Sequence, residues 1–199
     1  MAKKTQVPIG VSARHVHLTN AHIEQLFGAG AVLTFDFPLS QLGQFAAIER
    51  VKLETVKGVI DGVRVLGPAR SASQVEISKT DSLQLGLQPP IRLSGDIAGS
   101  ESITLVGPNG KVLLNEGVII AKAHIHMHPD DAQQFEVEDG EEVDVVVNSE
   151  RPITFRDVVV RVHPQFKLDM HIDTDEGNAA NISQGVFGTV VKKGAMLDG

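Results

Sequence analysis

The stretch Ala123-His124-Ile125-His126-Met127 has an earlier counterpart in Arg14-His15-Val16-His17-Leu18. Successive side chains of a β-strand point to opposite faces, so the two histidines of each stretch lie on the same face. Two imidazoles about 7 Å apart along one strand can converge on a single metal ion. Each stretch therefore predicts a strand that carries a candidate metal site.

The surrounding chain repeats itself, with the histidine pairs offset by 109 residues (124 − 15). Each pair is followed by a predicted short helix, which ends near Phe27 in one copy and near Phe135 in the other. Two later pairs of segments also correspond: 63–65 with 160–162, and 75–77 with 170–172. The simplest account is two related halves, each with one histidine pair and one later polar ligand.

The repeat supplies three candidate ligands per half, which is the number that a catalytic zinc site takes from the protein. The first set is His15, His17 and Glu76, and the second is His124, His126 and His171. One His-x-His pattern is a weak signal, but two in matching contexts are hard to explain as packing. The remaining histidines are not predicted to be ligands: His22 on the solvated face of the first helix, His128 at a helix cap and His163 at a strand end.

The composition limits the class of protein. Of 199 residues, 42% are hydrophobic and the only aromatic type is Phe, so the core must consist mainly of Val, Ile and Leu, which favour strands. A formal net charge of −7 argues against a nucleic-acid partner. With no cysteine, disulfides, thiolate zinc sites and acyl-cysteine chemistry are excluded. Without a signal region or an apolar run of ~18 residues, we expect a soluble, cytoplasmic protein with no membrane partner.

Short strands separated by glycine and proline turns dominate the predicted secondary structure. The strongest turn signal is Asn109-Gly110, between strands expected at 103–106 and 112–114. Only two helices are expected, one capped by Thr19 and one beginning at His128-Pro129. This pattern predicts a mainly β architecture of barrels.

Arg70 is the cation with the clearest candidate role. It follows the turn Gly67-Pro68-Ala69, which would place it close to Glu76. A guanidinium binds phosphate through paired hydrogen bonds and keeps its charge. A surface arginine paired with a carboxylate fits the sequence equally well, and for Lys57 and Arg64 a solvated charge is the default interpretation. The chain has no glycine-rich nucleotide loop, so phosphate recognition must use side chains, strand-edge amides or metal.

Six blocks of sequence, in this order along the chain, resemble the phosphate propanoyltransferase family of propanediol utilisation. They are 11–18, 40–47, 63–70, 74–78, 118–127 and 170–176. The resemblance implies an acyltransferase that interconverts a short-chain acyl-CoA (propanoyl- or acetyl-CoA) plus phosphate with acyl phosphate plus CoA. It also implies two related β-barrel domains with helical caps, at 14–121 and 122–191, with a strand at 4–13 exchanged into the second.

The resemblance extends to the site residues. It implies two zinc ions per chain, one bound by His15, His17 and Glu76 and the other by His124, His126 and His171. It makes Arg70 the catalytic, phosphate-binding residue, and it places five residues near CoA: Ser12, Ala13, Lys57, Arg64 and Asn178. Without a cysteine or a recognisable nucleophile–base pair, direct attack of phosphate on the thioester is the expected route, with metal as Lewis acid.

Two expectations concern location and assembly. Relatives inside bacterial microcompartments often carry an amphipathic N-terminal helix, for which residues 1–6 are too short, so association with a shell is doubtful. A homo-oligomer is compatible with the sequence. Two other functions remain open: a two-metal hydrolase, which would release CoA without phosphate, and a zinc-stabilised binding module, which would release none.

Overall fold

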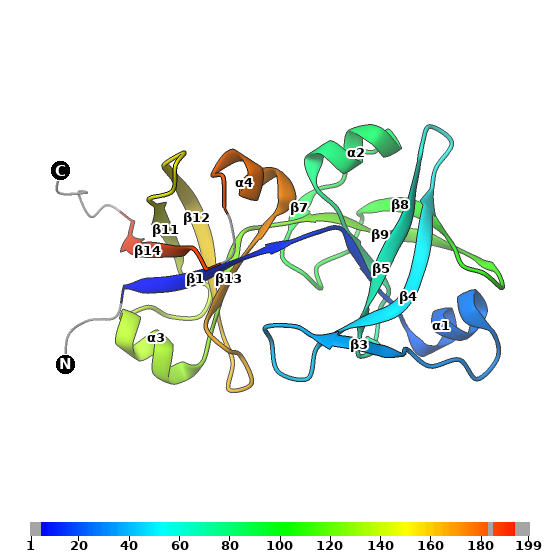
Figure 1. The fold of residues 1–199 in the computed structure, drawn as a ribbon, viewed down its shortest axis with the longest axis horizontal. Helices are drawn as coiled ribbons and strands as arrows, with labels where there is room; N and C mark the ends of the chain where they lie inside the picture. The colour runs from blue at the N-terminus through cyan, green and yellow to red at the C-terminus, as the bar shows by residue number, and fades with distance from the viewer. Residues whose placement is uncertain (1–4, 183–184, 194–199) are drawn as a thin grey trace. The chain divides into compact units, whose positions relative to one another are not determined.

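The computed structural model describes residues 5–182 and 185–193 (Figure 1). The chain divides into two compact units. The central unit comprises Ala13–Ala121, and the terminal unit comprises Met1–Ser12 together with Lys122–Gly199. Lys4, at the start of the predicted N-terminal strand, lies outside the described residues.

In the central unit, six of the described strands close into a barrel. Around the barrel they are β2 (His15–His17), β5 (Val59–Gly67), β4 (Phe45–Glu54), β8 (Glu101–Val106), β9 (Lys111–Ala121) and β6 (Gln74–Glu76), which returns to β2. Two further strands extend this sheet: β3 (Phe35–Pro38) pairs with β4, and β7 (Ile91–Arg92) pairs with β9.

The described residues of the terminal unit form a second closed barrel of six strands. Around the barrel they are β10 (His124–Met127), β12 (Ile153–Val162), β11 (Glu142–Val147), β14 (Phe187–Lys192), β1 (Gln6–Ser12) and β13 (Asp169–Asp173). Strand directions match those of the first barrel: β10 is parallel to β12 as β2 is to β5, and β1 is parallel to β13 as β9 is to β6. The predicted mainly β fold of two barrels is confirmed.

Each histidine strand follows a strand that belongs to the other barrel. β1 leads into β2 but pairs with β13 and β14, whereas β9 leads into β10 but pairs with β6, β7 and β8. β1 in the terminal barrel therefore holds the place that β9 holds in the central one. Two corresponding barrels result, although the terminal one is built from both ends of the chain.

The ladder registers correct one part of the predicted repeat. His15 lies opposite Arg64, whereas His124 lies opposite Val159. Matching Arg64 with Arg161 is therefore wrong, because Arg161 lies two residues farther along its strand. A slip of two residues keeps every side chain on the same face, so an alternating Val-Arg-Val pattern does not reveal it.

Four short helices cap the barrels within the described residues: α1 (Asn20–Phe27), α2 (Lys79–Leu85), α3 (Pro129–Phe135) and α4 (Thr174–Ala179). The sequence predicted α1 and α3, including the caps at Thr19 and His128. It missed α2 and α4, which contain seven and six residues and, unlike the seven-residue α3, have no proline at their start. Their remaining sequence signal is a capping box, Ser78 with Asp81 in α2 and Asp173 with Glu176 in α4.

Each barrel has its own core of aliphatic side chains. Val16 and Leu18 are buried in the central core, and Ile125 and Met127 in the terminal core. These residues alternate with the histidines, so the imidazoles point to the other face of the strand. A fully buried aliphatic side chain contributes about 1.5–3 kcal/mol, and a one-residue slip would forfeit it. Core packing therefore fixes which way the histidines point.

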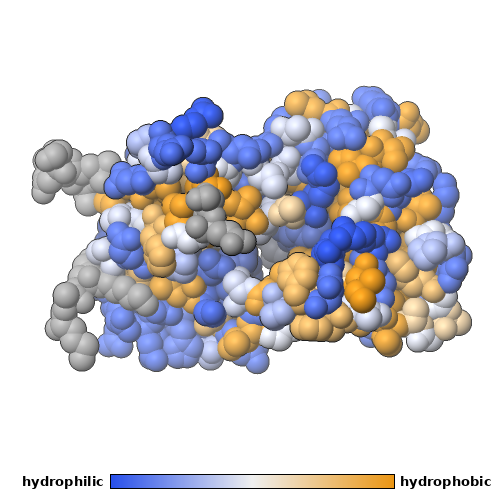
Figure 2. Space-filling view, viewed as in Figure 1, coloured by the Kyte–Doolittle hydropathy of each residue, from blue (hydrophilic) through white to orange (hydrophobic). Residues whose placement is uncertain are grey.

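On the face drawn in Figure 2, apolar residues are interleaved with hydrophilic ones over both units. In the central unit the exposed apolar side chains include Phe35, Phe37 and Ile48, on β3 and β4. None of the helices in residues 5–182 and 185–193 has the length and apolar composition needed to cross a membrane.

Candidate functional site

Three side chains of the central unit form the cluster that we call the Glu76 cluster: His15, His17 and Glu76. Antiparallel pairing of β2 with β6 puts His15 directly opposite Glu76. The Nε2 atoms of His15 and His17 lie 3.4 and 3.9 Å from the two carboxylate oxygens of Glu76. All three residues are buried, and their ligand atoms lie within 4.8 Å of one another. This arrangement can hold one metal ion.

The terminal unit holds the corresponding His171 cluster of His124, His126 and His171. Antiparallel pairing of β10 with β13 puts His124 opposite His171. The ring centroid of His171 lies 5.4 Å from that of His124 and 4.8 Å from that of His126. The ligand atoms again lie within 4.8 Å of one another. The structure thus brings the three predicted ligands of each set together.

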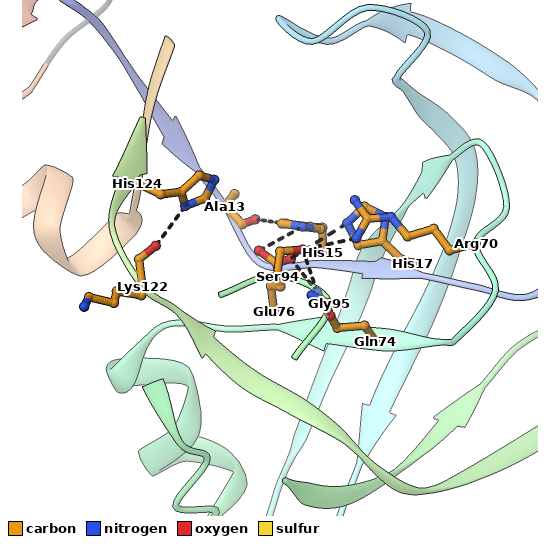
Figure 3. Close-up of polar contacts among 10 residues, drawn as sticks. All are labelled: Ala13, His15, His17, Arg70, Gln74, Glu76, Ser94, Gly95, Lys122 and His124. Carbon is orange, nitrogen blue, oxygen red and sulfur yellow. Dashed lines mark hydrogen bonds and ion pairs between the residues drawn. The ribbon is translucent and has the colours of Figure 1, made fainter. Parts of the chain in front are cut away.

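The first histidine of each pair is oriented in the same way. The Nδ1 atom of His15 lies 2.9 Å from the carbonyl oxygen of Ala13, and that of His124 lies 2.8 Å from the carbonyl oxygen of Lys122 (Figure 3). A ring that donates its Nδ1–H to a carbonyl keeps the lone pair of Nε2 for a metal. The backbone therefore presets the tautomer that metal binding needs.

The residue two positions before the third ligand also has a matched role, which the sequence did not reveal. The amide of Gln74 donates a 2.6 Å hydrogen bond to Oε1 of Glu76. In the other unit, Oδ2 of Asp169 lies 3.1 Å from Nε2 of His171. A donor therefore stands beside the carboxylate and an acceptor beside the imidazole. Their identical spacing from the third ligand was the only sequence signal.

A hydroxyl group connects Arg70 to the Glu76 cluster (Figure 3). The Ser94 hydroxyl accepts hydrogen bonds from Nη1 of Arg70 at 3.1 Å and from Nε2 of Gln74 at 3.0 Å. It donates its own hydrogen to Oε1 of Glu76 at 2.7 Å. The backbone N–H of Gly95 holds the Gln74 oxygen at 2.7 Å. Ser94 was also missed, because it lies in an irregular turn after β7.

Charge is unevenly distributed within the Glu76 cluster. Burial alone would lower the pKa of His15, but the carboxylate of Glu76 outweighs it and the pKa is raised. Burial, with the neighbouring charges of His15 and Arg70, holds the pKa of His17 well below its usual value. Burial opposes the charged form of Glu76, yet His15 holds that pKa well below its usual range. Within the cluster, the carboxylate therefore favours the protonated form of His15 and its own charged form, whereas the neutral form is favoured for His17.

Arg70 lies in the bend between β5 and β6 and is linked through Ser94 to Glu76, the residue it was predicted to lie close to. Its backbone N–H donates to the carbonyl oxygen of Leu18 at 2.8 Å, which ties the bend to the end of β2. Arg70 also forms part of the wall of a cavity of about 250 Å³. The other lining residues are Leu42, Gly43, Gln44, Gly67 and Pro68. A small anion in this cavity would be within reach of the guanidinium.

The residues expected near CoA fall in both units. In the terminal unit, Ser12 ends β1 and Asn178 lies in α4, which packs on β1. In the central unit, Arg64 lies opposite His15, and its guanidinium pairs with Asp36 at 2.5 Å. The carbonyl of Ala13, as described above, holds His15.

Lys57 lies at the turn end of the hairpin that carries Arg64. It lies in the β4–β5 turn, beside the end of α2, where Gly86 approaches its side chain. Six residues, 58–63, separate Lys57 from Arg64, and five of them belong to β5, so the two Cα atoms lie at most roughly 23 Å apart. Its sequence neighbours gave no sign of this separation, because it depends on how far the hairpin extends.

Comparisons with known proteins agree on one family. A family model described as phosphate propanoyltransferase matches residues 8–183. The chain belongs to the phosphate propanoyltransferase family. It is therefore an acyltransferase, as the sequence resemblance predicted, and both ligand clusters, Ser94 and Arg70 fall inside the matched region.

Three relatives named phosphate propanoyltransferase illustrate the similarity. The one from Priestia megaterium is 58% identical over 92% of this chain and 84% of its own length. The one from Lachnoclostridium phytofermentans is 54% identical over 93% and 87%, and the one from Thermotoga maritima is 50% identical over 93% and 89%. The similarity thus extends over nearly the full length of both chains.

Proposed function

We propose that this phosphate acyltransferase interconverts a short-chain acyl-CoA, propanoyl- or acetyl-CoA, plus phosphate with acyl phosphate plus CoA, and that each cluster binds one zinc ion. The observation that carries the proposal is the shared Ser94 hydroxyl. It lies 3.1 Å from Arg70 and 2.7 Å from Glu76, so the candidate phosphate residue and a candidate metal ligand are held by one group.

The donor sets suit zinc. Imidazole nitrogen and carboxylate oxygen are ordinary zinc ligands, and three protein ligands leave a position for substrate. Nε2 of His15 lies 3.4 Å from Glu76, and a divalent cation would displace a proton held between them, because metal ligands bind in their deprotonated forms. Bound zinc would supply Lewis-acid polarisation of an oxygen atom.

Arg70 holds and orients phosphate in this proposal. A guanidinium carries five N–H donors in a rigid fork, so it can donate to Ser94 and to phosphate together. A phosphate oxygen attacks the thioester carbonyl carbon, the carbon–sulfur bond breaks, and CoA leaves as its thiolate. Holding the attacking oxygen near the carbonyl carbon removes much of the entropic barrier.

Five residues are proposed to bind CoA, and Lys57 differs from the other four in its position. Ser12, Ala13, Arg64 and Asn178 are proposed to contact CoA. Lys57, in the β4–β5 turn seven positions before Arg64, would contact a different part of the same ligand. The Arg64 guanidinium is already oriented by Asp36 and by the Ala47 carbonyl at 2.7 Å.

The test follows CoA thiol release from acetyl-CoA and from propanoyl-CoA, with and without phosphate. Release that requires phosphate supports the transferase, release without phosphate indicates a hydrolase, and no release indicates a binding module. Arg70→Ala should raise the phosphate KM about 100-fold, the equivalent of losing one or two charge-assisted hydrogen bonds.

His163→Ala is the matched control for Arg70→Ala. The backbone N–H of exposed His163 bonds to the Met127 carbonyl at 3.1 Å, as that of Arg70 bonds to Leu18. This control should leave the phosphate KM unchanged. If Arg70→Ala behaves like the control, the phosphate role of Arg70 is wrong.

A further inference from the structure

His22, in α1, does not lie on a solvated helix face as predicted from the sequence. It is half-buried, and its Nδ1 atom lies 2.6 Å from the hydroxyl of Ser73. Ser73 is only 6% exposed and lies immediately before β6. This hydrogen bond connects α1 to the segment that precedes β6.

The direction of this hydrogen bond follows from the other contacts of Ser73. The backbone N–H of Thr19 donates to the Ser73 hydroxyl at 3.0 Å, so the hydroxyl hydrogen is available for Nδ1 of His22. Burial lowers the pKa of His22, which favours the neutral ring, and in its Nε2–H tautomer Nδ1 accepts the Ser73 hydrogen. The backbone N–H of His22 in turn donates to the Thr19 hydroxyl at 3.2 Å. Thr19, His22 and Ser73 thus form a closed set of directed bonds.

These bonds hold one end of the loop that carries Arg70. At the other end, the backbone N–H of Arg70 bonds to the Leu18 carbonyl at 2.8 Å. The two residues between the ends, Ser71 and Ala72, are exposed. Both anchor points on the opposite side lie in 18–22, directly after the histidine pair of the Glu76 cluster. The loop is therefore fixed to the segment that directly continues the strand of His15 and His17.

We propose that His22 is a positioning residue for phosphate binding, which acts by accepting the hydrogen bond of Ser73 and so holds the loop of Arg70 in place. The inference rests on the proposed function, in which Arg70 binds phosphate. Without the imidazole, the buried Ser73 hydroxyl loses its acceptor, and this end of the loop keeps only the hydrogen bond from the backbone N–H of Thr19. Small displacements of a guanidinium weaken bidentate binding, because both hydrogen bonds depend on its orientation.

The test compares variants of His22 by steady-state kinetics. His22→Ala should raise the phosphate KM about 3- to 10-fold, the equivalent of one neutral hydrogen bond, with little change in the acyl-CoA KM. His22→Asn should restore a phosphate KM within about 2-fold of the natural protein, because its amide oxygen takes the place of Nδ1. His22→Gln, with its oxygen one carbon farther out, should not restore it.

Two controls separate positioning from general destabilisation. Gln25, also in α1, donates from its side chain to the Lys111 carbonyl at 2.9 Å and ties the helix to β9 instead. Gln25→Ala should lower the melting temperature without changing the phosphate KM. Ser73→Ala should raise the phosphate KM at least as much as His22→Ala, because it also removes the bond from Thr19, and the double variant should be no worse than Ser73→Ala alone.

The outcomes distinguish this inference from the proposed function. If Arg70→Ala raises the phosphate KM but His22→Ala and His22→Gln do not, the inference is overturned and the proposed function stands. If Asn and Gln at position 22 behave alike, the imidazole has no acceptor role and the inference is also overturned. If Arg70→Ala leaves the phosphate KM unchanged, the proposed function itself is wrong.

Discussion

The Glu76 cluster and the His171 cluster have the same backbone arrangement but different chemistry. In each, a pair of histidines on a short strand faces a third residue across an antiparallel ladder. The paired rings stand nearly perpendicular in both, with centroids 4.9 and 4.7 Å apart. The third residue is a carboxylate in one cluster and an imidazole in the other. The strands set where the ligands lie, and side-chain identity sets the charge.

The residues beside the third ligands complete this contrast. Gln74 gives a neutral donor to a charged ligand, whereas Asp169 gives a charged acceptor to a neutral ligand. Each cluster therefore includes or adjoins one carboxyl group, but only in the Glu76 cluster is that group a candidate ligand. An ion bound to Glu76 would be partly neutralised directly, and one bound by three imidazoles would keep more of its charge for a substrate oxygen.

The largest expected effect comes from removing one ligand in each cluster. His15→Ala and His124→Ala should each lose about one zinc per chain, measured by elemental analysis. Activity should fall by more than about 100-fold in both, because even residues behind metal ligands change it 10- to 100-fold. Full metal content in one variant would show that its cluster does not bind metal and would end the comparison.

A smaller effect is expected from the residues beside the third ligands. Gln74→Leu removes the donor to Glu76, and Asp169→Asn removes the charged acceptor of His171. Each should weaken zinc affinity about 10- to 100-fold in its own cluster, measured by competition with a chelator. The other cluster of the same variant is the internal control. If either variant weakened the zinc affinity of both clusters equally, Gln74 and Asp169 would not each support one cluster alone.

The smallest effect concerns the helices that follow the third ligands. The capping box of α2 holds one carboxylate, Asp81, which pairs with Arg14 at 2.6 Å, whereas that of α4 holds two. Burial, together with the charges of Asp173 and Asp175, raises the pKa of Glu176 from 4.5 to about 7. When the pKa of a carboxyl group is higher in the folded than in the unfolded protein, the free energy of unfolding falls as the pH rises. The fall begins near the pKa of the unfolded state and continues through that of the folded state.

Glu176→Gln tests this difference between the two helices. Between pH 4.5 and pH 8, the free energy of unfolding of the natural protein should fall by on the order of 1–3 kcal/mol relative to that of the variant. One pKa unit corresponds to about 1.4 kcal/mol. Urea unfolding of both proteins at several pH values measures the difference. Parallel pH dependences would show that Glu176 titrates normally.

Much of the site could be predicted before the structure, because its signals are local. Alternation along a strand placed the two histidines of each pair on one face, and the internal repeat pointed to Glu76 and His171. The N-caps at Thr19 and His128 marked the two helices that the sequence predicted. These features depend on a strand period or a helix cap, which a few neighbouring residues specify.

The tertiary structure decided the contacts between distant residues. Ser94 bonds to Glu76 across 18 residues of sequence, and His22 lies against Ser73 across 51. The two-residue correction at Arg161 and the placement of β1 in the terminal barrel also depend on ladders between remote strands. Hydrogen bonds of this kind follow from closing the barrels, so no pattern of neighbouring residues encodes them. The sequence by itself specified the candidate ligands, and the fold specified the groups that orient them.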